Sequence, residues 1–474
     1  MDKILIVGSS HSAYGALLKL ESVDNIDITL IDSSDLEIKN STDCVFSNVY
    51  SYPNRIKGDK YFDTSSFENI DKKTPYPSKI FGGNSNFWGG TLSDIDKEII
   101  NSFKKEGIQI EKYFELIKAK FNKLSFDSNT INDLNYVNTK RENRIYKNLT
   151  KFNNDYLQTS PSTICLDGSV SQQEINKNQI CDVCKGYAWA CKEDTIWSSK
   201  SYIKKLIESK KIKYLANTSL ISFKDLPKEV SCYLKTDEKI KNFKFDKIFI
   251  CAGAMGTAKI LLNSFEELNS IEIKNSDLYT IPFFNIRRDG EKRHSFSDIF
   301  ISYKNNANSF IQLYSFSTGV FKLSTDAVKI AKYFQSFPST LFKNFGGLFV
   351  YIGQENSTRF LISKQNDILK YIEVNTYFNF LKYFKNVIIK LIKVGIIPLP
   401  FLLKKYSYGT SNHYGSSFPH NKNKEKFTTD RLGRLPKTDN VHILDATVLP
   451  IIPAGPIAVL ICSNSYRIVE EIYS

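Results

Sequence analysis

The sequence has few of the residues and segments that identify a class of protein at once. Its 474 residues include only five histidines and eight cysteines. Cysteines this sparse exclude the disulfide framework of a small secreted domain, so we expect mostly reduced thiols. The absence of an internal repeat of roughly 20 to 50 residues excludes a solenoid or a propeller.

A secretory signal is also missing. The chain opens directly on the apolar run "KILIVG", without a basic stretch, a long apolar core or a small-residue cleavage site. We therefore expect a cytoplasmic protein.

Acidic residues are too few to balance the basic ones, because 64 Lys and Arg stand against 50 Asp and Glu and give a net charge of +14. A positive field favours anionic partners such as phosphorylated substrates, nucleic acid or an acidic membrane surface. No domain-sized basic block with interleaved aromatic residues is present, so we expect no nucleic-acid partner.

The length and composition predict a folded protein with a sizeable core. The chain is 42% hydrophobic and 24% charged, which is typical of globular proteins. Its length exceeds what one ordinary core needs, so we expect two domains, or one domain with a large insertion.

The N-terminal segment has the pattern of a dinucleotide-binding unit. The strand at residues 3–8 ends on Gly8, a helical pattern follows, and a second apolar strand ends on Asp32, 24 residues after Gly8. That carboxylate stands where a Rossmann unit binds a ribose hydroxyl. The glycine fingerprint is altered, since Ser10 and Ala13 replace its second and third glycines. Ser10 must keep its side chain aside or donate to a phosphate.

Three later stretches carry small residues beside predicted strands and helices. The stretch "FGGNSNFWGG" at residues 81–90 pairs glycines with Asn, Ser and Trp, which suits a loop that cradles a ligand. Residues 245–264 predict a buried strand, a small-residue turn and an apolar helix. Residues 439–473 predict a strand ending at Asp445, a proline-rich loop and a final helix that begins near Pro456.

In this order and spacing, the four segments resemble the glucose-methanol-choline family of flavoprotein oxidoreductases. The resemblance implies FAD and an α/β fold with two domains. A Rossmann-type FAD-binding domain would be built from discontinuous segments, residues 1–99, 191–265 and 421–474. An α+β substrate domain with an antiparallel sheet would comprise residues 100–190 and 266–420.

The resemblance also implies the cofactor-binding residues. The first turn would hold the adenosine and pyrophosphate through Gly8, Ser10, Ala13 and Asp32. The glycine-rich loop would line the flavin with Gly83, Asn84, Ser85, Asn86 and Trp88. The later segments would close the pocket with Ala252, Gly253, Asp445, Ala446 and Pro456.

The catalytic motif of the family is altered in this chain. The family oxidises alcohols by hydride transfer to flavin N5, with a histidine base in the motif H-x-x-G-T. The matching residues here are "NHYGS", so Asn412 stands at the usual base position and His413 follows it. The second family residue, His or Asn, falls on Gly455. We expect His413 to act as the base and Asn412 to orient the substrate oxygen; the alternative is a loop histidine without chemistry.

The other four histidines fit structural or loop positions better. His11 lies on the phosphate turn and His442 lies within a predicted strand, while His294 and His420 are expected in loops.

Three cysteines lie close together in "CDVCKGYAWAC". Cys181, Cys184 and Cys191 could bind zinc or part of an iron-sulfur cluster, or they could be packed thiols. Since only three thiolates are local and no histidine is near, we expect no metal.

A basic amphipathic helix is predicted within residues 381–405. Lys382, Lys385, Lys390 and Lys393 fall within about 140° of arc, opposite Phe384, Val387, Ile388, Leu391 and Ile392. Two alternatives stay open: the helix lies on an anionic membrane surface, or its apolar face packs inside the substrate domain.

Taken together, the sequence predicts an FAD-dependent oxidoreductase that acts on the CH–OH group of a sugar, a polyol or a lipid-linked sugar. We expect it in the cytoplasm, either free or peripheral at the inner face of the membrane. The alternative is a flavin-binding protein with lost or redox-neutral chemistry that serves as a binding or assembly component at the membrane.

Overall fold

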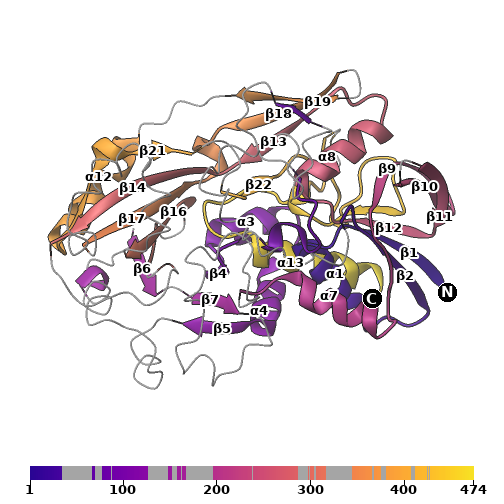
Figure 1. Ribbon diagram of the computed structural model, residues 1–474, viewed down its shortest axis with the longest axis horizontal. Coiled ribbons are helices and arrows are strands. Elements are labelled where there is room, and N and C mark those ends of the chain that lie inside the picture. The colour runs from indigo at the N-terminus through magenta and orange to yellow at the C-terminus, as the bar shows by residue number, and fades with distance from the viewer. Residues whose placement is uncertain are drawn as a thin grey trace.

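The computed structural model describes a chain that is mostly β-sheet on one side and mixed α/β on the other (Figure 1). The described residues are 1–34, 67–69, 77–86, 88–125, 148–151, 157–161, 163–166, 196–237, 239–286, 297, 299–303, 306–315, 344–365, 368–374, 380–406, 411–423, 425 and 427–474. The predictions for Cys181, Cys184, Cys191 and His294 lie outside these residues.

A parallel sheet of five strands organises one half. Its order is β23-β12-β1-β2-β8, and every neighbouring pair is parallel. The strands are β1 (Asp2–Val7), β2 (Ile26–Ile31), β8 (Lys213–Leu215), β12 (Lys247–Ile250) and β23 (Val441–Ile443). They come from both ends and the middle of the chain, so long-range pairing assembles this sheet.

Both faces of the parallel sheet are covered, which is why its strands are almost wholly apolar. On one face Ile4 and Ile6 pack against α1 (His11–Leu20), α7 (Ser199–Glu208) and α13 (Ala458–Ile472). On the other face Leu5 and Val7 pack against helix α8 and an antiparallel meander. These elements are α8 (Gly253–Ser264), β9 (Thr218–Leu226), β10 (Glu229–Thr236) and β11 (Lys239–Phe245).

Antiparallel pairing dominates the other half. The largest sheet has the order β20-β14-β17-β16-β15-β6, with β21 also paired to β14. Its strands are β6 (Leu157–Pro161), β14 (Asp277–Asn285), β15 (Ile299–Tyr303), β16 (Asn306–Ser315), β17 (Phe345–Ile352), β20 (Ile396–Pro398) and β21 (Lys404–Lys405).

Two smaller sheets and helices α3 and α4 are further parts of the described fold. One sheet has the order β22-β13-β18-β19-β3 and the other β4-β7-β5. The elements are β3 (Phe67–Asn69), β4 (Thr91–Leu92), β5 (Asn122–Ser125), β7 (Thr163–Leu166), β13 (Ser270–Asn275), β18 (Arg359–Gln365), β19 (Ile368–Val374), β22 (Tyr414–Gly415), α3 (Lys97–Lys105) and α4 (Ile110–Lys120). The α/β class with one parallel sheet and separate antiparallel sheets is confirmed, whereas the domain boundaries stay a prediction.

Helix α12 (Phe380–Lys393) covers one face of the large antiparallel sheet. Phe384, Val387 and Leu391 are buried against strand residues such as Ile281 and Val350. Most of the apolar face of this helix therefore packs into the core, whereas Ile392 of the same face is 49% exposed. Among the described residues, no helix combines the length and the apolar character needed to cross a bilayer.

Candidate functional site

The turn after β1 is held by a very close approach between two strand ends. Gly8 has a φ of +99°, and a Cβ placed on it would lie 2.5 Å from the carbonyl oxygen of Cys251. Only glycine combines this φ with so short a distance. This close approach fixes the path of the turn. Gly8 itself is not among the residues that line the cavity described below.

Ser10 is accommodated by a glycine of another loop. A Cβ placed on Gly83, whose φ is +52°, would lie 2.9 Å from the Cβ of Ser10. The serine that replaces the second fingerprint glycine thus fits because residue 83 has no side chain. The Ser10 hydroxyl oxygen lies 3.4 Å from Nδ1 of His11, at the start of α1.

Small residues also set the packing of α1. Ala13 is fully buried against the parallel sheet. A Cβ placed on Gly15 would lie 2.2 Å from the carbonyl oxygen of Cys462, so α1 and α13 touch backbone to backbone at this point. Sequence reasoning missed Gly15, although a glycine inside a helical pattern is a signal of close packing.

Asp32 joins the first turn to the glycine-rich loop. Its Oδ1 accepts hydrogen bonds from the Ser34 amide at 3.0 Å and the Ser34 hydroxyl at 2.7 Å, and its Oδ2 accepts from the Ser9 hydroxyl. Ser9 Oγ in turn accepts from the Gly82 amide at 2.7 Å. Burial raises the pKa of Asp32, and the bonds from Ser34 and Ser9 oppose that rise. A ribose-binding role for Asp32 stays a prediction.

The glycine-rich loop separates into residues that hold it and residues that face the cavity. Ser85 Oγ donates to the Gly82 carbonyl at 2.6 Å, and Asn86 Nδ2 donates to the Phe81 carbonyl at 2.9 Å. Both side chains are buried inside the loop. Asn84 and Trp88 instead line the cavity, where Asn84 Nδ2 donates to the Tyr414 hydroxyl at 3.2 Å.

The third and fourth segments meet at Asp445. Its Oδ1 accepts from the Thr447 amide at 2.9 Å, and its Oδ2 accepts from the Thr257 hydroxyl of α8. Burial raises the pKa of Asp445, and these hydrogen bonds, with one from the Gly253 amide, oppose the rise. Its hydrogen bonds therefore tie the last loop to the start of α8.

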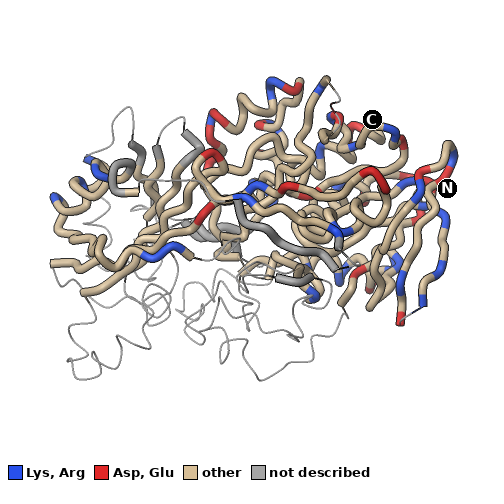
Figure 2. The backbone as a smooth tube through the Cα atoms, turned by 90° about the horizontal axis from the view of Figure 1, so that it is seen from above, with Lys and Arg blue, Asp and Glu red and all other residues tan. Residues whose placement is uncertain are grey.

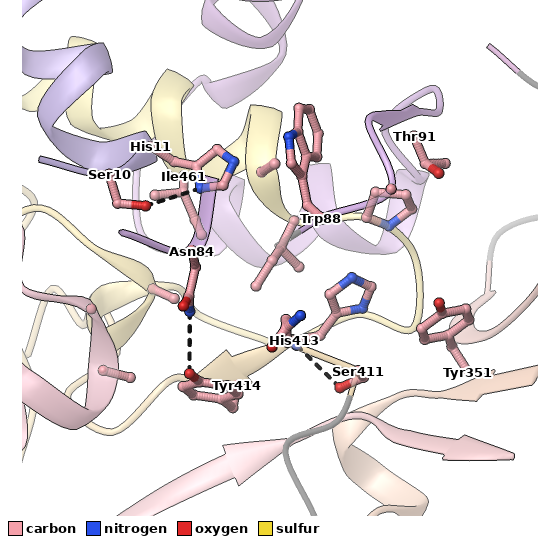
Figure 3. A pocket seen from close by; sticks show the side chains of 18 of the residues that line it. Ser10, His11, Asn84, Trp88, Thr91, Tyr351, Ser411, His413, Tyr414 and Ile461 are labelled. Atoms are coloured by element: carbon pink, nitrogen blue, oxygen red, sulfur yellow. Dashed lines mark hydrogen bonds between the residues drawn. The ribbon is translucent and has the colours of Figure 1, made fainter. Parts of the chain in front are cut away.

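The cavity lies between the parallel-sheet half and the large antiparallel sheet, and its volume is about 1290 Å³ with its mouth included (Figure 3). The sequence-predicted residues that line it are Ser10, Asn84, Trp88, Gly253, Asn412, His413, Asp445, Ala446 and Pro456. The others are not among its lining residues: Gly8, Ala13, Asp32, Gly83, Ser85, Asn86 and Ala252.

Sequence reasoning missed one whole wall of the cavity and one histidine. The wall comprises Thr91, Gln312, Tyr314, Phe349, Tyr351 and Tyr406. The histidine is His11, whose ring meets Trp88 edge-on with centroids 5.2 Å apart. Burial lowers the pKa of His11 to about 3, and its Nε2 has no hydrogen-bond partner among the described residues.

The segment that carries His413 runs beside the last loop. Backbone amides of Ser416 and Phe418 donate to the carbonyls of Ala446 and Thr447 at 2.8 and 3.0 Å. Asn412 has a φ of +58°, in the left-handed region, and the chain turns there. These contacts bring a motif and a loop 30 to 40 residues apart in sequence to the same place.

The ring of His413 lies on the cavity wall between Tyr351 and the loop of Asn84 and Trp88 (Figure 3). It stacks on Tyr351 with centroids 5.2 Å apart and an interplanar angle of 24°. Burial lowers the pKa of His413 to about 4, and a hydrogen bond with the Ala454 backbone opposes this decrease in part. The imidazole is therefore neutral at physiological pH and able to accept a proton.

Gly455 faces a second cavity, of about 780 Å³ with its mouth included. A Cβ placed on Gly455 would meet only Phe310 Cδ2, at 3.9 Å. The position thus has room for the side chain that the family resemblance leads one to expect, and no described residue supplies it.

The remaining described histidines have structural partners. His420 is buried, and its Nδ1 lies 2.7 Å from the Asp430 carbonyl oxygen. His442 Nδ1 lies 2.9 Å from the Leu432 carbonyl oxygen. Neither lines the cavity.

Comparison with known proteins agrees with this architecture. No protein-family model and no curated protein sequence matches the chain. Solved structures do match, among them the crystal structure of pyridoxine 4-oxidase from Mesorbium loti, which aligns over 99% of each chain with a TM-score of 0.60 and 10% identity. The chain shares the fold of this oxidase. The predicted glucose-methanol-choline type of fold is therefore confirmed, at an identity that marks a divergent sequence.

Proposed function

We propose that the protein binds FAD and oxidises an alcohol, with His413 as the base. The observation that carries this proposal is a neutral histidine on the wall of a cavity bordered by the phosphate turn, the glycine-rich loop and the start of α13. The similar oxidase is named for an alcohol, pyridoxine, which supports this substrate class.

The residues present suit FAD. The turn after β1 brings Ser10 and His11 to the cavity at the start of α1, where free backbone amides favour a phosphate. The buried Nε2 of His11 lacks a partner and could hydrogen-bond to the cofactor. Trp88, Ala446 and Pro456 would border the flavin, and Asp445 lines the same cavity with both of its carboxyl oxygens accepting hydrogen bonds.

Bound FAD would supply an acceptor for the carbinol hydride at flavin N5. His413 takes the hydroxyl proton of the substrate as the hydride leaves, so the alcohol becomes an aldehyde or a ketone. The stack on Tyr351 fixes the plane of the imidazole. The Ser411 hydroxyl accepts from the His413 amide at 3.1 Å and holds the backbone behind it. Asn412, beside it on the cavity wall, orients the substrate oxygen in this proposal.

A flavin spectrum and anaerobic reduction test the proposal. The purified protein, reconstituted with FAD, should show the flavin absorbance band, and mixing with a panel of alcohols without oxygen should bleach it. Absence of the band after reconstitution would refute FAD binding. A stable band that no alcohol bleaches would instead favour the flavin-binding protein without alcohol chemistry, which the empty position at Gly455 supports.

Membrane contact is a separate proposal. The outer side of α12 and the turn after β20 expose Ile389 (41%), Ile392 (49%) and Phe401 (79%), and residues 375–424 contain no acidic residue. Such a surface would bind anionic vesicles, so the enzyme would be cytoplasmic and peripheral. Sedimentation with anionic liposomes should fall when Lys385 and Lys393 are changed to Glu; unchanged sedimentation would reject the contact.

A further inference from the structure

Aromatic side chains dominate the cavity wall opposite the phosphate turn. Tyr314 of β16 and Phe349 of β17 lie with ring centroids 4.9 Å apart, and Tyr351 of β17 stacks on His413. Tyr406, just after β21, adds a fourth ring. Ring faces offer dispersion contacts to a flat group and few directional hydrogen bonds.

Three polar side chains of this wall bind one another. The Tyr314 hydroxyl donates to Gln312 Oε1 at 2.7 Å, and Gln312 Nε2 donates to Thr91 Oγ1 at 3.3 Å. All three side chains are at least 94% buried. A sugar or polyol placed here would have to break these bonds or leave its own hydroxyls unpaired, and either makes its binding less favourable.

Charge is also scarce around the cavity. Among the described lining residues there is no Lys or Arg, and the one carboxyl group, that of Asp445, accepts hydrogen bonds from Thr257 and Thr447. Lys405 stands next to Tyr406 but pairs with Asp277 at 2.9 Å. Lys and Arg residues are spread along the described chain (Figure 2), and those of α12, such as Lys385 and Lys393, lie outside the lining of the cavity. Although the net charge of the chain is +14, no described Lys or Arg lines the cavity to pair with a phosphate or carboxylate of the substrate.

We propose that the substrate is an uncharged aromatic alcohol whose hydroxyl-bearing carbon is attached to a flat ring. This rests on the proposed function. The ring packs against Tyr314, Phe349 and Tyr351, and the carbinol lies beside His413. The C–H bond breaks with its electron pair as hydride to the flavin, the O–H proton passes to His413, and an aromatic aldehyde or ketone forms. This substrate class replaces the sugar, polyol and lipid-linked sugar that composition and resemblance favour.

Substrate classes can be compared directly on the FAD-loaded protein. Benzyl alcohol and 4-(hydroxymethyl)pyridine are mixed without oxygen at matched concentrations against glucose, mannitol and glucose 6-phosphate. We expect the two aromatic alcohols to bleach the flavin about a hundredfold faster than the others, since unpaired polar groups make a site reject the wrong substrate strongly. Bleaching by glucose or mannitol at an equal or higher rate would overturn the inference and leave the proposed function intact. No bleaching by any of the five, with the flavin band present, would count against the proposed function itself.

Substitution of the wall gives a second readout that does not depend on turnover. Benzaldehyde, the product analogue, should perturb the flavin absorbance on binding, and its dissociation constant should rise about tenfold in Tyr351→Leu. Tyr351→Phe keeps the ring, so the dissociation constant of benzaldehyde should rise less in this variant. Tyr233→Leu, on the β9–β10–β11 meander, is the matched control for removing a tyrosine ring away from the cavity. Equal benzaldehyde affinity in Tyr351→Leu and wild type would refute the role of this wall, and flavin content and circular dichroism confirm that each variant is folded.

Discussion

The turn after β1 and the loop before α13 reach the same cavity, but their backbones are packed very differently. At Gly8 an added Cβ would lie 2.5 Å from a backbone oxygen, whereas at Gly455 the nearest atom of the described residues would be 3.9 Å away. The first position is glycine because nothing else fits. The second is glycine although a larger residue would fit.

This difference separates two kinds of constraint. The cofactor side depends on close backbone contacts at Gly8 and Gly15 and on the contact of Gly83 with the Ser10 side chain, all of which an added side chain would disrupt. The proton-handling side depends on a few side chains that face open space, so one can be lost without disturbing the fold. A divergent sequence can therefore keep the first side and change the second.

The largest expected effect is on the proton-handling side. His413→Ala removes the base, and the rate of flavin reduction by a substrate alcohol should fall by roughly a hundred- to ten-thousandfold. The flavin absorbance band should not change, because the cofactor side is left intact. The rate is measured by anaerobic stopped-flow mixing.

The matched control is His442→Gln, since His442 is buried at the Leu432 carbonyl and lies away from the cavity. A reduction rate in His413→Ala within threefold of wild type would remove His413 from the mechanism.

Acid should affect both sides, because each holds a neutral histidine whose pKa is lowered. Burial lowers the pKa of His11 to about 3 and that of His413 to about 4, below the ordinary value of 6.5. The unfolded chain then binds more protons than the folded one, so the free energy of unfolding falls as the pH drops from 6.5 towards 4. Each pKa unit corresponds to about 1.4 kcal/mol, and His420 and His442 act in the same direction.

Two buried carboxyls act in the opposite direction. The raised pKa values of Asp32 and Asp445 contribute stability at low pH that is lost as the pH rises, and hydrogen bonds reduce both contributions. Urea midpoints at pH 7.0 and 4.5 should still show a net loss in acid. His11→Gln and His413→Gln should each reduce that loss, and a midpoint equal at the two pH values would contradict the burial of these rings.

A smaller effect tests the packing contrast itself. Gly8→Ala forces a Cβ against the Cys251 carbonyl at a φ of +99°, and it should lower the free energy of unfolding by about 3 kcal/mol or more. Gly455→Ala meets no close atom and should change it by about 0.5 kcal/mol or less. Both are measured by urea denaturation. Equal losses for the two variants would erase the distinction between the two sides.

The same contrast explains what the sequence could and could not predict. The elements of the cofactor side follow local sequence patterns: a strand, a turn and a helix follow one another around Gly8, and again around Gly253. Such patterns can be recognised in a single sequence. The order of the four segments then predicted the type of fold, which the comparison with solved structures confirms.

The aromatic wall was not predictable in the same way. Tyr314 and Tyr351 lie on β16 and β17, whose register joins residues about 40 positions apart, such as Ile311 and Val350. Which strand residues face the cavity depends on that register, and no local pattern fixes it. His11 was missed for another reason: its place on a phosphate turn suggested a structural role, and its unpartnered Nε2 at the cavity is seen only in the structure.

The smallest expected effect concerns Asn412, which stands where the family resemblance places the base. Its φ of +58° costs most residues about 1 kcal/mol or more, and asparagine tolerates it better than alanine. Asn412→Ala should therefore lower the free energy of unfolding by about 1 kcal/mol, and Asn412→Gly should restore it. If Asn412 serves only to turn the backbone, Asn412→Gly also restores the rate of flavin reduction. If its amide orients the substrate oxygen, both variants reduce the flavin more slowly than wild type at saturating alcohol while only Asn412→Ala loses stability.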